Sequence, residues 1–490
     1  MNTVVSPPKS ETQDADQAQL PLVVDLDGTL TSSDTLHEAL LKLASDKPSD
    51  LRKTPGWLRE GKAAFKSHVA DSVVLTSEDL PLRDEVIALA KKARAEGRTV
   101  LLVTAADQRQ ADGIAGDLDL FDEIVGSDGT RNLGGSEKAA YLTDRFGAGG
   151  FDYVGDARAD LPVWSAARKA ITVAASPSLK PSIRSHGGEV ETLVPAPDPA
   201  KQARIRLKAM RPHQWLKNLL IFVPAIAAHN PGALGITALA FIAFSLAASS
   251  IYLINDMLDL QVDRRHPRKR NRPFAAGTLS VKDGAIQTAI LLAVSLTMAV
   301  LISPLFLLVL LGYVALTTLY SFYLKRKLMV DIWMLAALYT VRLVAGAVAA
   351  GVVLSEWLAA FSMFIFLALA AVKRQSELAD LVKRGKTSTD GRGYQTTDLP
   401  VVLGVVLAAG YCSVLVLALY VSSESVSSLY GEPRLLWLAC PLILYWISRA
   451  AMISHRGLMD DDPIIFAIKD RVSLAIFAMF GFIFVLSALL

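Results

Sequence analysis

Hydrophobic and polar positions follow two different patterns along the 490 residues of this chain. In the first 175 residues, short apolar runs alternate with amphipathic stretches such as DEVIALAKKARAEG. Strands that alternate with helices in this way form a parallel sheet that is covered by helices on both faces. We therefore expect a Rossmann-like α/β domain whose buried strands include LPLVV, TVLLVTAA (99–106), FDEIVGSD (121–128) and FDYVG.

Long apolar runs fill the second part of the chain. A helix of about 20 apolar residues crosses the ~30 Å hydrocarbon core of a bilayer. The runs predict an all-α, polytopic membrane domain of about nine transmembrane helices, of which the first and third are short. The nine runs lie at about residues 215–230, 235–255, 285–302, 304–323, 329–351, 356–372, 399–420, 434–453 and 472–490.

Composition divides the chain into four segments. Residues 1–19 are polar and predict a disordered leader with no cleaved signal peptide, since no apolar stretch follows a basic start. The α/β domain is expected over 20–175 and the membrane domain over 205–490. The Pro- and Ser-rich segment 176–204 is expected to link them.

The net charge of +3 is the sum of two unlike parts. Residues 1–200 carry 22 Lys and Arg against 31 Asp and Glu, whereas residues 201–490 carry 28 against 16. This division, together with the apolar runs, excludes a single soluble globular protein. We expect a lipid bilayer as partner and no nucleic acid. The sequence leaves the oligomeric state open.

The basic residues of the second part indicate how it is oriented. Of its 28 Lys and Arg residues, 26 lie in alternate loops that share one side of the predicted membrane domain. By the positive-inside rule these loops are cytoplasmic. We therefore expect a multi-pass protein of a bacterial-type inner membrane. Its soluble part and active sites face the cytoplasm, and an odd number of spans places the C-terminus outside.

The motif DLDGT directly follows the first predicted strand, where open α/β sheets place their sites. Asp25 and Asp27 are separated by one residue, so that both side chains can point the same way from the strand end. One carboxylate can attack phosphorus while the other protonates the leaving oxygen. Mg²⁺ would neutralise the charge of the phosphate.

Three further pieces of such a site follow in order. Thr104 ends the second predicted strand and can donate a hydrogen bond to a phosphoryl oxygen. Lys138 begins a predicted helix and can balance negative charge. Asp156 and Asp160, in GDARAD, supply the acidic side of a metal site, and Asp160 is also a candidate for substrate contact. Four pieces in this order favour a phosphoryl-transfer site over ordinary helix caps.

Residues 20–175, with these motifs, resemble the haloacid dehalogenase (HAD) superfamily. The resemblance implies that Asp25 is the phosphorylated nucleophile and Asp27 the general acid and base. It implies phosphate-ligand roles for the threonine and the lysine, and Mg²⁺ held by Asp25, Asp27 and Asp156. It also implies that the insert at about 31–80 is a small helical cap.

A second acidic motif, NDMLDLQVD, lies at the end of the second apolar run. Asn255, Asp259 and Asp263 are spaced i, i+4, i+8, so they share one helical face, and Asp256 adds a carboxylate beside them. Hard oxygen ligands one turn apart suit Mg²⁺ bound to a diphosphate. Polar groups at a membrane boundary are costly, which favours a functional role.

The predicted spans and NDxxDxxxD resemble the UbiA superfamily of intramembrane prenyltransferases over residues 205–490. The family's second aspartate-rich motif reads KRQSE here, so Lys373 replaces a carboxylate and only Glu377 remains. This change and the segments 211–218, 320–333 and 455–473 resemble decaprenyl-phosphate phosphoribosyltransferases. That resemblance implies transfer of 5-phosphoribose from phosphoribosyl pyrophosphate (PRPP) to a polyprenyl phosphate.

The cationic residues near these motifs are candidates for binding the substrate phosphates. Arg342 is the one basic residue well inside an apolar run, where it either binds a phosphate or carboxylate or hydrogen-bonds a neighbouring helix. The remaining substrate-binding candidates are Lys217, Arg270, Arg272, Lys325, Lys373, Arg374 and the acidic Glu377.

The fusion predicts a two-step enzyme. Phosphoribosyl transfer leaves a lipid-linked ribose with a 5-phosphate, which the HAD-like domain would remove. One alternative is a prenyltransferase that uses a prenyl diphosphate and an aromatic or glycerol acceptor. In a second alternative the HAD-like domain acts on another substrate or is a non-catalytic binding module.

Overall fold

The computed structural model describes residues 20–184, 189–385, 387, 393–423, 430–459 and 463–490, so the expected leader 1–19 lies outside the described residues. The chain forms two compact units that do not follow the sequence order. One unit joins Met1–Met210 with Tyr252–Thr288, and the other joins Arg211–Ile251 with Ala289–Leu490. A segment inside the predicted membrane domain therefore packs with the α/β fold.

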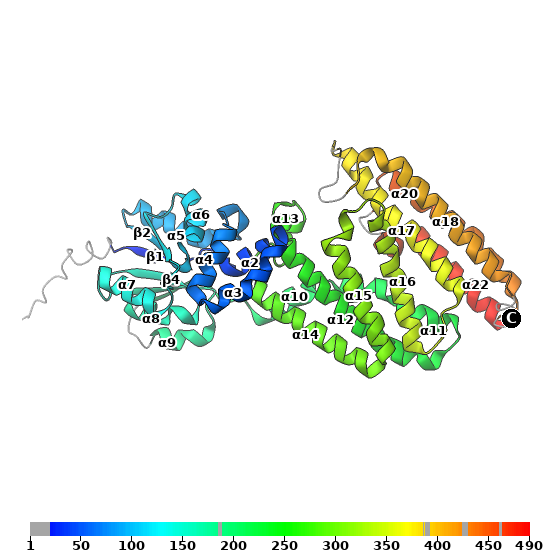
Figure 1. Ribbon diagram of the computed structural model, residues 1–490, viewed down its shortest axis with the longest axis horizontal. Coiled ribbons are helices and arrows are strands. Elements are labelled where there is room, and N and C mark those ends of the chain that lie inside the picture. Colours follow the sequence, from blue (N-terminus) through cyan, green and yellow to red (C-terminus); the bar gives the residue numbers. More distant parts are fainter. Residues whose placement is uncertain (1–19, 185–188, 386, 388–392, 424–429, 460–462) are drawn as a thin grey trace, which may run out of the picture. The chain divides into compact units, whose positions relative to one another are not determined.

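The α/β fold is a six-stranded sheet in the order β3-β2-β1-β4-β5-β6, and every neighbouring pair of strands is parallel (Figure 1). This confirms the expected fold class. The four predicted strands are present, and two more extend the sheet. The strands are β1 (Leu22–Val24), β2 (Val100–Asp107), β3 (Glu123–Ser127), β4 (Asp152–Gly155), β5 (Lys169–Val173) and β6 (Glu189–Val194).

Strand β6 lies inside the segment that was expected to be a linker, residues 176–204. Its sequence EVETLV leaves most side chains exposed or half-buried, and it pairs only with β5 at the edge of the sheet. The linker expectation is wrong here because an edge strand tolerates charged residues, which hide the apolar signal of a buried strand.

Helices cover both faces of the sheet. Leu22 and Val24 pack against one set of helices, whereas Val23 points to the opposite face. The first face is covered by α5 (Asp84–Ala95) and α6 (Gln108–Ala115), and the second by α7 (Ser136–Phe146), α8 (Leu161–Ala166) and α9 (Lys180–Arg184). Burial on both faces explains why β1 is apolar at three consecutive positions.

The insert after β1 forms the predicted helical cap. Asp34 begins its first helix as N-cap, because its carboxylate accepts the backbone N–H of His37 at 3.0 Å. Two short 3₁₀ turns complete the insert. The cap consists of α2 (Thr35–Asp46), η1 (Pro48–Lys53), α3 (Thr54–Arg59), α4 (Lys62–Ser72) and η2 (Ser77–Asp79), and α10 (Pro199–Ala209) follows the sheet.

Eight helices in the described residues are long and apolar enough to cross a membrane. The expected polytopic helical domain is confirmed, and eight of the nine predicted runs are present as long helices. They are α12 (Leu234–Leu258), α14 (Val281–Ile302), α15 (Pro304–Phe322), α16 (Val330–Ala350), α17 (Glu356–Lys383), α18 (Leu399–Val421), α20 (Ala439–His455) and α22 (Arg471–Leu489), and the short α21 (Pro463–Lys469) precedes the last.

The missing span is the first apolar run, at about 215–230. It forms a 3₁₀ stretch, η6 (Pro212–Phe222), followed by the short helix α11 (Val223–Ala227). Pro224 lies at the start of α11, where its ring and missing N–H end the preceding helical hydrogen bonding. The apolar run is present, but Pro224 separates the 3₁₀ stretch from the α-helix that follows.

The second unit packs closely where η6 meets α16. A Cβ added at Gly346 of α16 would lie 2.0 Å from the carbonyl oxygen of Ile221. Small residues allow such close backbone approach in membrane proteins. By contrast, a Cβ at Gly404 of α18 would meet nothing within 4 Å.

The contrast between these two glycines gives a prediction. Gly346→Ala forces η6 and α16 apart and should lower the free energy of unfolding by about 1–3 kcal/mol. Gly404→Ala adds a better helix former in open space and should leave stability unchanged or slightly higher. Thermal unfolding in detergent compares the two variants. Equal melting temperatures would show that the close approach does not constrain the packing.

Candidate functional site

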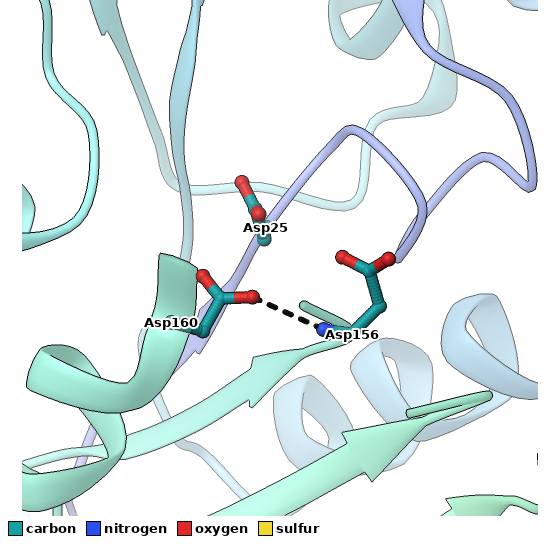
Figure 2. Close-up of side chains that lie close together, drawn as sticks. All are labelled: Asp25, Asp156 and Asp160. Carbon is teal, nitrogen blue, oxygen red and sulfur yellow. Dashed lines mark hydrogen bonds between the residues drawn. The ribbon is translucent and has the colours of Figure 1, made fainter. Parts of the chain in front are cut away.

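Three carboxylates converge at the carboxyl ends of the central strands. Asp25 follows β1, and Asp156 and Asp160 follow β4. One oxygen atom of each lies within 4.8 Å of the others, and Figure 2 shows the side chains turned toward a common point. Oxygen ligands in this arrangement fit Mg²⁺. The sequence predicted Asp25 as a metal ligand and Asp156 and Asp160 as the acidic side of a metal site, and the structure brings these three side chains together.

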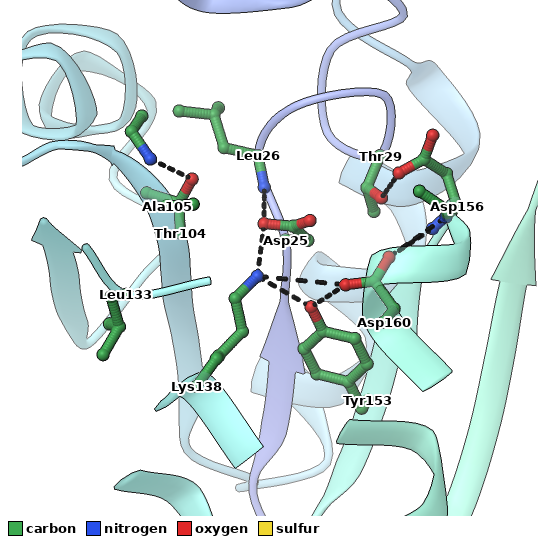
Figure 3. Close-up of polar contacts among 12 residues, drawn as sticks. Asp25, Leu26, Thr29, Thr104, Ala105, Leu133, Lys138, Tyr153, Asp156 and Asp160 are labelled. Carbon is green, nitrogen blue, oxygen red and sulfur yellow. Dashed lines mark hydrogen bonds and ion pairs between the residues drawn. The ribbon is translucent and has the colours of Figure 1, made fainter. Parts of the chain in front are cut away.

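A buried lysine links this cluster to the core. Lys138 Nζ lies 2.8 Å from Asp25 Oδ1 and donates to the Tyr153 hydroxyl at 2.9 Å (Figure 3). The Tyr153 hydroxyl in turn donates to Asp160 Oδ1 at 2.8 Å. The Lys138 side chain is 3% exposed, so its charge is held beside the carboxylates in a weakly screened environment. This arrangement positions one cation beside a reacting group.

The turn after β1 requires glycine. Gly28 has φ +74°, and a Cβ there would lie 2.2 Å from Asp156 Oδ2. The adjacent Thr29 donates from its hydroxyl to Asp156 Oδ1 at 3.4 Å. The DLDGT turn thus passes directly against the carboxylate of Asp156, which explains the glycine and threonine of the motif.

Asp27 lies outside the carboxylate cluster and lines a cavity of about 280 Å³. The backbone N–H of Thr35 donates to Asp27 Oδ1 at 2.7 Å. Lys62 and Lys66 of the cap line the same cavity. Asp27, which was expected to bind metal and to act as acid and base, therefore lies beside this cavity and not in the cluster of three carboxylates.

Burial and mutual repulsion raise the pKa values of the carboxyl groups. Burial raises the pKa of Asp25 to about 6, where Lys138 opposes the shift and Asp160 adds to it. Burial and the nearby Asp34 raise the pKa of Asp27 to about 7. Burial, then Asp25 and Asp160, raise the pKa of Asp156 to about 8. Like charges held this close favour either protons or a cation between them.

Thr104 was expected to end the second strand, but β2 continues to Asp107, so that Thr104 lies inside it. It is fully buried in β2, and its hydroxyl oxygen accepts the backbone N–H of Ala106 at 3.1 Å. That bond leaves the hydroxyl proton to donate to a ligand. Sequence reasoning missed Tyr153 and Lys66. Tyr153 reads as an ordinary strand residue, and Lys66, whose Nζ donates to Asn132 Oδ1 at 2.9 Å, carries no motif signal.

The second acidic motif keeps its predicted spacing across a helix break. Helix α12 ends at Leu258, and Asp259 caps the short helix α13 (Leu260–Arg265). The i to i+4 backbone bonds from Asp259 to Asn255 and from Asp263 to Asp259 continue through the break, at 2.9 and 2.8 Å. The three side chains therefore remain one turn apart.

Arg272 pairs with this motif. Its Nη1 lies 2.6 Å from Asp263 Oδ2 and 3.2 Å from Asp256 Oδ1, and both carboxylates are buried. Arg272 was predicted as a phosphate ligand. A guanidinium already held at the carboxylates is placed where a diphosphate bound to them would arrive. Arg270, from the same loop, is exposed.

Arg342 has neutral partners in the second unit. The side chain is 4% exposed, and its Nε donates to Asn218 Oδ1 at 2.8 Å. It also donates to the Leu338 carbonyl and lies over the rings of Phe244 and Tyr313. These contacts satisfy the guanidinium within the bundle and favour its packing role over phosphate binding.

Arg374 belongs to a buried ion-pair network. Its side chain is fully buried, lies 2.5 Å from Asp331 and also pairs with Glu377. The Tyr394 hydroxyl donates to Asp331. The predicted substrate-binding residues Arg374 and Glu377 thus contact each other. Lys373, Lys217 and Lys325 are half-buried, and Lys217 Nζ lies 5.9 Å from the ring centroid of Tyr339.

The fold defines a protein with a parallel, Rossmann-like α/β domain and a helical part with eight candidate membrane spans in the described residues. A family model described as the UbiA prenyltransferase family matches residues 219–488. The chain therefore belongs to the UbiA prenyltransferase family.

Individual proteins are similar to most or to parts of this chain. An uncharacterised protein, y4nM of Sinorhizobium fredii, is 39% identical over 474 residues, covering 96% of this chain and 91% of its own. A decaprenyl-phosphate phosphoribosyltransferase of Mycobacterium tuberculosis is 38% identical over 179 residues, which cover 35% of this chain and 59% of the relative. A solved HAD-family hydrolase of Salmonella enterica serovar Typhi covers 35% of this chain and 68% of its own, with 14% identity and a TM-score of 0.27.

The raised carboxyl pKa values predict how Mg²⁺ binding depends on pH. Because the metal must displace protons from these groups, its affinity should rise by about tenfold to hundredfold from pH 6 to pH 8. Calorimetry of the full chain in buffers of different ionisation enthalpy measures both affinity and proton release. Asp156→Asn should remove most of the effect. Mg²⁺ binding that is independent of pH would contradict the proposed site.

Proposed function

We propose that the α/β domain is a Mg²⁺-dependent phosphatase. The observation that carries this proposal is the cluster of Asp25, Asp156 and Asp160 with the buried Lys138 beside it. Mg²⁺ bound at these carboxylates would offset the negative charge of a phosphate group. Lys138 and Thr104 would contact the other phosphate oxygens.

Asp25 and Asp27 divide the chemistry. A carboxylate oxygen of Asp25 forms a bond to phosphorus as the bond to the leaving oxygen breaks, and Asp27 gives that oxygen its proton. Asp27 then takes a proton from the water that hydrolyses the aspartyl-phosphate, which releases inorganic phosphate and restores Asp25. A pKa of about 7 suits Asp27 to both proton transfers near neutral pH.

A substitution at the nucleophile tests this proposal. Asp25→Asn keeps the shape of the side chain but removes the nucleophile, so phosphate release from a phosphomonoester should fall by at least about 10³-fold. Asp144→Asn, at an exposed position of α7, is the matched control and should retain normal turnover. Normal turnover by Asp25→Asn would refute the assignment.

We propose that the membrane domain transfers 5-phosphoribose from PRPP to a polyprenyl phosphate. The relative named decaprenyl-phosphate phosphoribosyltransferase supports this choice within the UbiA family. Asn255, Asp259 and Asp263 would hold Mg²⁺, which would offset the charge of the departing pyrophosphate. The lipid phosphate oxygen forms the bond to C1 of the ribose as the bond to pyrophosphate breaks.

The basic residues complete the proposed transferase. Arg272 is our first choice for the pyrophosphate because it already pairs with the acidic motif. Lys373, which stands where the family's second motif has a carboxylate, suits a substrate with an extra phosphate. Lys217, Lys325 and Arg270 remain candidates for the 5-phosphate and the lipid phosphate. We propose packing roles for Arg342 and Arg374.

The two activities act in sequence in this proposal. The transferase product carries a 5-phosphate on its ribose, and the phosphatase removes it to leave polyprenylphosphoryl ribose. Both parts belong to one chain, which raises the effective concentration of the intermediate at the second site. We place both sites on the cytoplasmic side of an inner membrane, because the basic loops would face the cytoplasm. An odd number of spans would place the C-terminus on the opposite side of the membrane.

Transfer to lipid is tested with PRPP labelled in the ribose. Purified chain in detergent with Mg²⁺ and polyprenyl phosphate should yield labelled lipid, and Asp263→Asn should reduce the yield at least about 10²-fold by removing a metal ligand. Asp283→Asn, a partly exposed acidic residue in the first turn of α14, is the control and should retain activity. Absence of labelled lipid, together with activity on a prenyl diphosphate, would support prenyl transfer instead.

A further inference from the structure

A buried ion pair joins the phosphatase cap to the segment that carries the transferase motif. Glu38 lies on α2 of the cap, and Arg264 lies on α13, directly after Asp263. Arg264 Nη2 is 2.7 Å from Glu38 Oε1, and Nη1 is 3.0 Å from Oε2. The Glu38 side chain is 1% exposed and the Arg264 side chain is 8% exposed. This is a two-pronged guanidinium–carboxylate contact between residues 226 positions apart.

Further contacts fix both partners. Arg264 also donates to the backbone carbonyls of Asp79, in the cap, and Ala275, in its own segment. Glu38 Oε1 accepts the Ser33 hydroxyl at 2.6 Å. Each group therefore has several partners, and neither has freedom to turn away without leaving buried polar atoms unsatisfied.

The pair reaches the phosphatase site through the first turn of α2. Glu38 lies one turn after Thr35, whose backbone N–H holds Asp27 Oδ1 at 2.7 Å. On the other side, the carbonyl of Ser33 accepts the backbone N–H of Gly28 at 3.2 Å, next to Asp27. Arg264 therefore anchors Glu38, and Glu38 in turn is bonded to Ser33 and lies one turn after Thr35.

Stability alone does not account for such a pair. Removing two charges from water costs as much as their attraction returns, and well-packed apolar residues would serve at least as well. A guanidinium group whose hydrogen bonds are all made also fixes the orientation of its partner. Here the partner lies on α2, whose first residue bonds Asp27.

We propose that Arg264 is a positioning residue of the phosphatase, and that it acts through Glu38 and α2 to orient Asp27 as the general acid. The inference rests on the proposed phosphatase function. It means that a residue within the UbiA family match, next to a transferase metal-ligand candidate, completes the phosphatase. A fragment that contains only the α/β domain would lack Arg264 and expose an unpaired Glu38.

The leaving group separates this role from a merely structural one. Ribose 5-phosphate has an alkoxide leaving group that needs a proton, whereas p-nitrophenyl phosphate releases a stable phenolate that does not. Misplacing the acid should therefore slow the first substrate and spare the second. General damage to the fold slows both alike.

The experiment measures kcat of the full chain with Mg²⁺ on both substrates. Arg264→Met should lower kcat for ribose 5-phosphate by about 10- to 100-fold and for p-nitrophenyl phosphate by less than about threefold. Glu38→Gln, an isosteric change, should do the same, and the double variant should be no worse than the poorer single variant. Arg265→Met is the matched control, since the Arg265 side chain is 69% exposed and its Nη2 lies 3.2 Å from Asp79 Oδ1, and it should leave both rates unchanged.

Different outcomes would contradict the positioning role of Arg264 and the phosphatase function. Equal losses on both substrates, no loss, or the same loss in Arg265→Met would overturn the positioning role while leaving the phosphatase intact. Failure of the unaltered chain to hydrolyse either substrate would overturn the phosphatase function, and the inference with it. If Arg264→Met does not fold, Glu38→Gln and Ser33→Ala give the same test with smaller changes.

Discussion

The structure depends on how carboxylates are kept together away from water. Asp25, Asp156 and Asp160 meet because the carboxyl ends of parallel strands share one edge of the sheet. Their mutual repulsion would oppose folding if nothing offset it. Lys138 and the Tyr153 hydroxyl offset part of this repulsion. The pKa values of Asp25 and Asp156 remain raised, so the cluster still favours binding protons or a cation. The uncompensated negative charge that opposes folding therefore also suits the cluster to a metal ion.

The acidic motif at the end of α12 follows the same principle with a different partner. There Arg272 lies between Asp256 and Asp263, and Asp263 is buried. Carboxylates and a guanidinium group neutralise one another there. In the function that we propose, a diphosphate and its metal would exchange partners with these groups, and both proposed phosphate sites would have their polar groups in place before the substrate binds.

Most of the fold could be predicted from sequence, because local signals agreed with the tertiary structure. Buried strands such as β1 are apolar throughout, and the candidate phosphatase residues follow strands in order. The predictions failed where a local signal was ambiguous. Strand β6 lies at an edge, where charged residues are tolerated, and Pro224 interrupts the first apolar run.

The candidate sites were harder to predict where roles depend on distant partners. Arg374 and Arg342 looked like phosphate ligands, since a buried cation has no visible partner in the sequence. Asp331 and Asn218, which they contact, lie 43 and 124 positions away. In the sequence Arg264 is one of several neighbouring basic residues, and its burial and its contacts with Glu38 and two backbone carbonyls distinguish it from Arg265.

A doubly labelled substrate tests the central claim, that one chain transfers phosphoribose to lipid and then removes its 5-phosphate. PRPP carries ¹⁴C in the ribose and ³²P only in the 5-phosphate. The account predicts that ¹⁴C enters the lipid fraction and that ³²P appears as inorganic phosphate at the same rate after a short lag. Lipid that keeps both labels, or lipid with neither, would contradict it.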